Sequence, residues 1–215
     1  MAMGERKDLV ALVADKNMQF ALRGILDTHK RLGIRPIDFV TYPHPKKDPG
    51  VFATCHDFLR PLQSMASFAL VMFDCHGCGS ASPREHLETE IGRRLAQNGW
   101  NDRSAVIAIE PELENWLWSD SPQVAKALGW PDNKLRTWLV QKGYRATGDV
   151  KPRKPKEAVE AVLRITRTPR SSAIYFDIAT HVSFELCKDP AFIKLRQVLS
   201  GWFPATDQGA ASRNR

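Results

Sequence analysis

Residues Ser67 to Ser80 have the sequence SFALVMFDCHGCGS, and this stretch decides the fold class. Phe68 to Phe73 form a continuous apolar run, which is typical of a strand that is buried on both faces. The run ends at Asp74, and a glycine-rich turn follows it. Strands of this kind occur in parallel sheets covered by helices, so the stretch indicates an α/β protein.

The segments on either side of this stretch repeat the same alternation of strand and helix. Strands are predicted for residues 8–15, 34–43, 67–74 and 103–110, and helices for residues 17–33, 51–65 and 82–100. In the last helix Ser82 suits the N-cap, Pro83 the first helical position and Glu85 a capping box. The order β-α-β-α-β-α-β predicts a mostly parallel central sheet with helices on both faces.

Beyond residue 110 the pattern becomes helical. A helix is predicted to begin with Pro111 at its first position, and short helices follow around residues 121–130 and 132–143. Residues 145–171 open as a basic, proline-rich loop and continue as a helix, and residues 172–203 are mostly helical. We therefore predict an α/β core over residues 1–120, a helical part packed on it over 121–204, and a flexible tail over 205–215.

Composition limits the classes of protein to which the chain can belong. The 215 residues are 43% apolar, which is enough for a core and argues against wholesale disorder. The net charge of +7 favours polyanionic partners such as nucleic acid. We find neither a membrane-spanning run nor a signal peptide, so a cytoplasmic protein is expected. In that compartment the four cysteines (Cys55, Cys75, Cys78 and Cys187) are expected to be thiols.

Three acids stand at the carboxyl ends of predicted strands, namely Asp15, Asp74 and Glu110, and Glu114 lies four residues after the last of them. If the strands are parallel, these acids converge at one edge of the sheet. Converging carboxylates repel each other unless a cation such as Mg²⁺ relieves the repulsion. The alternative is that the acids only cap the helices that follow, and the sequence leaves both open.

The turn DCHGCGS has several possible uses. His76 follows Asp74 by two residues, so in extended backbone both side chains face the same way, and His76 can serve as a metal ligand or as a general acid or base. The glycines allow backbone N–H groups to turn toward an anion. The spacing of Cys75 and Cys78, with Cys55 and His56 elsewhere, suggests a weaker zinc alternative. A tight turn with an incidental histidine is the structural alternative.

A basic stretch follows in the helical part. Between Lys151 and Arg170 there are seven Lys or Arg and two Glu. One interpretation is contact with a phosphate backbone, and the other is a solvated helix face. The residues predicted to contact nucleic acid are Lys151, Arg153, Lys154, Lys156 and Arg164.

The order of these parts resembles the Toprim-like proteins, the fold of primases, topoisomerases and OLD-type nucleases. More closely, the chain is similar to small stand-alone Toprim-related proteins of bacterial anti-phage defence loci, including methylation-associated systems. The resemblance spans about residues 8–202. It is carried by Asp15 after the first strand, DCHGCGS after the third, IEPELENWLWSD after the fourth, and the helices KPRKPKEAVEAVL and DPAFIKLRQVL.

The resemblance implies a metal-dependent site that acts on phosphodiesters. The implied metal ligands are Asp15, Asp74, Glu110 and Glu114. The chain departs from the family in two places: the first loop is VADKNM, without the usual glutamate in a glycine-bearing loop, and the usual Asp-x-Asp is Asp74-Cys75-His76. Histidine in place of a carboxylate removes one negative charge, so Mn²⁺ is expected as readily as Mg²⁺.

From the resemblance we expect metal-dependent cleavage of DNA or RNA in a bacterial defence complex, with other defence proteins as partners. Asp74 and either Glu110 or Glu114 would hold the cation, and Asp15 would complete its shell or orient a water. His76 would be a ligand or proton carrier, and Lys16 would hold the phosphate with the basic helix. The competing expectation is a non-catalytic nucleic-acid-binding or assembly subunit with a degenerate site, which the altered DCHGC turn favours. A third expectation, which rests on the Cys and His residues, is a zinc-stabilised interaction module.

Overall fold

The computed structural model describes residues 5–119, 121–182 and 187–205. Four strands form one sheet in the order β2-β1-β3-β4, and every neighbouring pair is parallel. The strands are β1 (Lys7–Val13), β2 (Phe39–Pro43), β3 (Ala66–Asp74) and β4 (Ser104–Ile109). The α/β class and the parallel central sheet predicted from the sequence are therefore confirmed.

The two central strands explain the continuous apolar runs. β1 and β3 pair from Leu9 with Phe68 to Val13 with Met72, and residues 9–13 and 69–73 are almost completely buried. Each of these strands has a neighbouring strand on both sides and helices on both faces, so neither of its faces meets solvent. In contrast, β2 is an edge strand, and all its residues are partly exposed.

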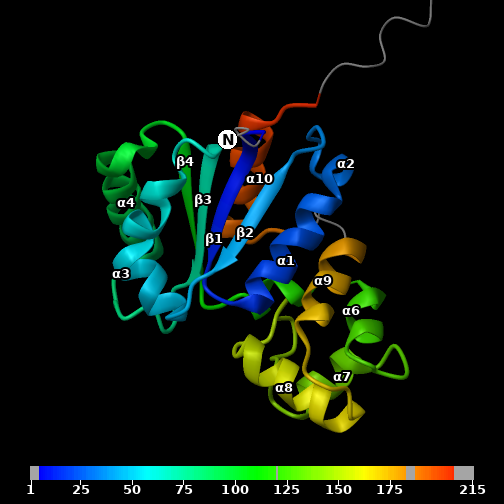
Figure 1. The fold of residues 1–215 in the computed structure, drawn as a ribbon. Helices are drawn as coiled ribbons and strands as arrows, with labels where there is room; N and C mark the ends of the chain where they lie inside the picture. The colour runs from blue at the N-terminus through cyan, green and yellow to red at the C-terminus, as the bar shows by residue number, and fades with distance from the viewer. Residues whose placement is uncertain (1–4, 120, 183–186, 206–215) are drawn as a thin grey trace, which may run out of the picture.

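Helices cover both faces of the sheet (Figure 1). One face carries α1 (Lys16–Asp27), α2 (His29–Leu32) and α10 (Pro190–Trp202), and the other carries α3 (Lys47–Leu59) and α4 (Arg84–Leu95). Short turns of helix, η1 (Arg60–Leu62) and η2 (Ala96–Trp100), extend α3 and α4. Helix α10 is fixed to the sheet by Trp202, whose ring stacks on Phe68 with centroids 4.6 Å apart.

Three predicted helix starts are wrong. Helix α3 begins at Lys47, four residues before the predicted start. Helix α4 begins at Arg84, and Pro83 rather than Ser82 occupies the N-cap position, with no side-chain cap bond. Pro111 does not start a helix, since α5 begins only at Glu114. The intervening segment bonds to the β3 turn instead: the Pro111 carbonyl accepts from the His76 N–H. These backbone groups serve tertiary contacts, which local sequence does not specify.

The remaining helices gather beyond the carboxyl edge of the sheet (Figure 1). They are α5 (Glu114–Leu117), α6 (Pro122–Ala127), α7 (Leu135–Gln141), α8 (Pro155–Thr166) and α9 (Ser172–His181). Helix α9 lies along α1, and Gly24 is needed there because a Cβ would meet the Phe176 carbonyl at 2.8 Å. The predicted boundary at residue 120 falls between α5 and α6, but α10 returns to the sheet. The predicted tail lies outside the described residues, apart from Ala205.

None of the helices in the described ranges has the length and apolar character that crossing a bilayer requires. This agrees with the sequence, in which no membrane-spanning run was found.

Candidate functional site

The strand order places a topological switch point at the carboxyl edge of the sheet. The chain runs from β1 to β2 at one side and from β2 back to β3 at the other, so the order reverses between β1 and β3. In open α/β sheets, ligands bind outside the carboxyl ends of the strands at such a switch point. Asp15 lies two residues after the end of β1, and Asp74 is the last residue of β3, so the two acids flank this position.

Asp15 also caps helix α1, which is the alternative role that the sequence left open for the strand-end acids. Its Oδ1 accepts from the Met18 N–H at 2.9 Å and so satisfies one free donor in the first turn of α1. Capping uses one carboxylate oxygen and leaves the negative charge in place. The two interpretations of Asp15 are therefore compatible.

Asp74 connects three segments of the site. Its backbone N–H donates to Oδ1 of Asp48 at 2.8 Å, and its own Oδ1 accepts from the Leu113 N–H at 2.9 Å. Asp48 lies in the first turn of α3, and Leu113 immediately precedes α5. The end of β3 is therefore fastened to the segments that follow β2 and β4.

Four carboxylates act on one another here, and we call Asp15, Asp48, Asp74 and Glu114 the carboxylate cluster. Burial raises the pKa of Asp74 well above its usual range, and the charges of Asp48, Glu114 and Asp15 raise it further. Burial also raises the pKa of Asp48, and the charge of Asp15 raises it further. The acids that end or follow β1, β2, β3 and β4 thus share one partly desolvated region.

Glu114 is buried in α5 and is held by a residue distant in sequence. The Tyr175 hydroxyl of α9 donates to its Oε1 at 2.7 Å. Burial raises the pKa of Glu114, whereas this hydrogen bond and the charge of Lys156 oppose the rise. Burial and the neighbouring Glu114 charge also raise the pKa of Tyr175, so its hydroxyl remains a donor.

The chemistry of the cluster suits a hard divalent cation, because carboxylate oxygens are the ligands that Mg²⁺ and Mn²⁺ prefer. In the described part of the chain, however, no three Asp, Glu, His or Cys side chains are grouped closely enough to hold one metal ion. The carboxylates therefore match the ion in chemical type, whereas their described arrangement does not form a closed metal site.

Three of the predicted site residues lie outside this network. Glu110 is exposed, and its charge acts on Cys75, whose pKa is raised mainly by burial. Lys16 is exposed at the start of α1. His76 is exposed in the turn after β3, and because the strand ends at Asp74, the alternation of side chains does not extend to it. Neither the Lys16 ammonium nor the His76 ring makes a hydrogen bond or ion pair with a described residue. Their predicted roles stay predictions.

Two members of the network were missed from the sequence. Asp48 falls between the strand predicted for residues 34–43 and the helix predicted for residues 51–65, and it follows β2 at the same edge as the other acids. The rule that strand-end acids converge would have found it. Tyr175 had no such signal, because 61 residues separate it from Glu114.

The cysteines are free thiols as expected, with Cys55 and Cys78 buried and Cys75 and Cys187 half-buried. Burial raises the pKa of Cys55 and of Cys75 to about 12. Zinc binds the thiolate form, which these two groups resist at neutral pH. The zinc alternative therefore gains no support from the structure.

The predicted nucleic-acid-binding residues fall into two groups. Three of them pair with nearby acids: Lys151 with Asp189 at 3.7 Å, Arg153 with Asp149 at 3.3 Å, and Lys154 with Glu157 at 2.9 Å. Lys156 and Arg164 are exposed on α8 and form no ion pair with any described residue. The latter two are better placed to meet a phosphate group.

The positive charge of the protein is concentrated in one part of the chain. Residues 121–182 contain twelve Lys or Arg and five Asp or Glu, a surplus of seven that equals the net charge of the whole chain. This count includes the cations and acids that pair with each other, so the surplus remains after pairing. The helices next to the carboxylate cluster therefore form the basic part of the molecule.

Comparisons with protein families, with curated proteins and with solved structures found no match. The fold and site define the protein as an all-parallel α/β protein with clustered carboxylates at its topological switch point and a basic helical part beside them.

Proposed function

We propose that the protein cleaves phosphodiester bonds of nucleic acid at the carboxylate cluster, in a metal-dependent reaction. The observation that supports this proposal is the desolvated position of Asp74, whose N–H donates to Asp48 and whose pKa the charges of Asp48 and Glu114 raise. Holding like charges there costs free energy, which a divalent cation would offset. The position at the switch point is also where substrates of open α/β sheets bind.

In this proposal Asp15, Asp48 and Asp74 hold the ion, and Asp48 takes the place that the sequence suggested for Glu110. A bound Mg²⁺ or Mn²⁺ would supply an activated water and neutralise charge on the phosphate. Glu114, oriented by Tyr175, is the residue placed to accept a proton from that water. Lys156, whose charge lowers the pKa of both Asp48 and Glu114, is placed to contact the phosphate.

The basic helices supply the preference for a polyanion, because each phosphate contact releases a bound counterion from nucleic acid. The resemblance to Toprim-like proteins supports the same chemistry. Membership of a bacterial defence complex is proposed from that resemblance alone.

A second candidate function is non-catalytic binding of nucleic acid. It is favoured by the hydrogen bonds that already occupy Asp48 and Asp74, and by the spacing of the carboxylates. The replacement of an acid by His76 in the DCHGC turn points in the same direction. In this alternative the basic helices have the same role.

Calorimetric titration of Mn²⁺ and of Mg²⁺ into wild type, Asp74→Asn and Glu110→Gln tests the first function. Glu110 is the matched control, since it also ends a strand but lies outside the network. We expect saturable binding in wild type and Glu110→Gln and none in Asp74→Asn, with cleavage of plasmid or single-stranded DNA or RNA following the same pattern. If none of the three proteins binds either ion while nucleic acid still binds, the second function replaces the first.

A further inference from the structure

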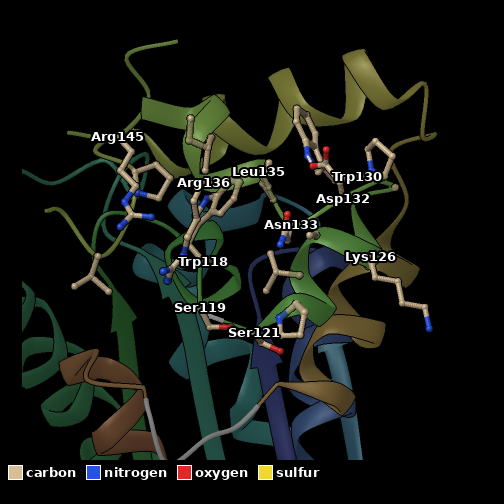
Figure 2. Close-up of a pocket in the computed structure, with 18 residues that line it drawn as sticks. Trp118, Ser119, Ser121, Lys126, Trp130, Asp132, Asn133, Leu135, Arg136 and Arg145 are labelled. Carbon is tan, nitrogen blue, oxygen red and sulfur yellow. Dashed lines mark hydrogen bonds between the residues drawn. The ribbon is translucent and has the colours of Figure 1, made fainter. Parts of the chain in front are cut away.

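A cavity lies in the helical part, and none of the clustered carboxylates lines it. It has a volume of about 640 Å³ and is enclosed by α6, α7 and the loops that follow them. Cavities of about 300–1,000 Å³ are the usual size for small-molecule sites. We call it the α6–α7 pocket, and Figure 2 shows its lining.

The α6–α7 pocket is lined by more cations than anions. Lys126, Arg136 and Arg145 line it, against a single described acid, Asp132. In Figure 2 the two arginines lie on one side and Lys126 and Asp132 on the other. Asp132 is engaged, because its Oδ1 accepts from the Lys134 N–H at 2.8 Å and from the indole of Trp130 at 3.0 Å.

The two arginines are close enough to affect each other. Burial lowers the pKa of Arg136, and the charge of Arg145 lowers it further. The Nε of Arg145 donates to the Asp149 carbonyl, which fixes the guanidinium at the rim of the pocket. Arg136 and Arg145 both line the pocket, and guanidinium groups suit a phosphate, whose oxygens accept from planar donors.

Two indole rings also line the α6–α7 pocket. Trp118 is almost fully buried and donates from Nε1 to the Pro155 carbonyl, so it forms a fixed wall. Trp130 is partly exposed, and it lines the pocket together with Asn133. Stacking on an aromatic ring is available to every nucleobase, and an amide can bond a base edge.

The α6–α7 pocket is also close to the carboxylate cluster along the chain. Trp118 follows Glu114 by four residues, so their Cα atoms lie within about 14 Å of each other even for a fully extended chain. Helix α5 makes the actual path shorter. A flexible strand with its phosphodiester at the cluster can therefore place a nearby nucleotide in the pocket.

We infer that the α6–α7 pocket binds one unpaired nucleotide of a nucleic-acid strand, with its phosphate at Arg136 and Arg145 and its base against Trp130. This inference rests on the proposed function, since it identifies the substrate as a strand with unpaired bases. Trp118 serves packing, and Trp130 packs against Trp138 with ring centroids 5.1 Å apart while it remains partly exposed.

The test measures binding of 5′-AMP and of inorganic phosphate by calorimetry, with tryptophan fluorescence as a second readout. We expect saturable binding of 5′-AMP to wild type, at least tenfold weaker binding to Arg145→Gln, and unchanged binding to Lys142→Gln. Lys142 is the matched control, because it is an exposed cation at the end of α7 that does not line the pocket. Asn133→Asp adds a charge at an exposed position and is expected to weaken binding without affecting folding.

Three results would overturn the inference. The first is no binding of 5′-AMP to wild type, and the second is binding of 5′-AMP to Arg145→Gln and to Asn133→Asp as tight as to wild type. The third is binding of inorganic phosphate to wild type as tight as that of 5′-AMP. The unpaired state is tested by competition, in which a single-stranded octanucleotide should displace 5′-AMP and a blunt duplex of the same length should not. Displacement by both would overturn it too. Asp74→Asn should keep 5′-AMP binding while losing metal binding, so failure of the inference and failure of the proposed function give different results.

Discussion

The carboxyl group of Asp74 is expected to make the fold less stable at neutral pH than at mildly acidic pH. Its pKa is raised in the folded state, so the folded protein binds its proton more tightly than the unfolded chain does. The fold should therefore gain stability as the pH falls from 7 through the folded-state pKa. The gain should end near the unfolded value of about 3.9.

Asp74→Asn should weaken this dependence, and the part that remains is due to Asp48 and Glu114, whose pKa values are also raised. Asparagine keeps the oxygen that accepts from Leu113 and carries no charge, so the variant should be more stable than wild type at pH 7. Each 1 kcal/mol gained would raise Tm by about 2–4 °C in a chain of this size. Thermal melts from pH 4 to 8 measure both effects, and a variant that melts below wild type at pH 7 would show that the charge is not destabilising.

Tyr175→Phe should have the opposite effect. Removing the hydroxyl leaves buried Glu114 without its donor at 2.7 Å, which should cost about 1–3 kcal/mol in the free energy of unfolding at pH 7. The loss should shrink at acidic pH, where Glu114 is protonated. Urea denaturation of Tyr175→Phe, Glu114→Gln and the double variant checks this, because strictly additive losses would mean that the two side chains do not interact.

At the scale of elements, Glu88 joins α4, β4 and α10. Its Oε1 accepts from the Ala108 N–H of the edge strand at 3.0 Å, and its Oε2 accepts from Lys194 of α10 at 2.8 Å. Glu88→Ala leaves a buried N–H without an acceptor, so a loss of about 2–4 kcal/mol is expected. Glu88→Gln keeps an acceptor and should lose less.

Amide hydrogen exchange at Ala108 distinguishes the causes of this loss. Faster exchange in Glu88→Ala than in Glu88→Gln is expected if the acceptor oxygen protects the edge strand. Equal exchange and equal loss of stability in both variants would assign the effect to the charge and its partner Lys194 instead.

The predicted and observed elements show which parts of the fold could be predicted from the sequence. The interiors of β1, β3 and β4 were predicted because strands buried on both faces must be continuously apolar. The starts of α4 and α5 were not, since Pro83 takes the cap position and the segment after Glu110 bonds to the β3 turn. The placement of Asp15 and Asp74 at the site could be predicted, because both lie at strand ends. The contact of Glu114 with Tyr175 could not, because it depends on how α9 packs against α1.

For the whole molecule, the separation of charge connects fold and function. The sheet and its covering helices are balanced in charge, while residues 121–182 carry the entire surplus of seven. Lys156 lies on α8 and acts on two of the clustered carboxylates, so the basic part meets the acidic cluster at that helix. A polyanion attracted by the surplus is thereby guided toward the carboxylates.

The salt dependence of nucleic-acid binding tests this arrangement. For Lys156→Gln with Arg164→Gln, the slope of log Kobs against log salt should become shallower by about 1.4–1.8, because each phosphate contact contributes roughly 0.7–0.9. Arg153→Gln with Lys154→Gln removes the same charge, but those cations already pair with Asp149 and Glu157, so the slope should change less. Fluorescence anisotropy with a labelled oligonucleotide between 50 and 200 mM salt measures both. Equal changes in the two double variants would mean that the protein presents only a diffuse positive field, whereas unequal changes locate the bound strand along α8, beside the carboxylate cluster.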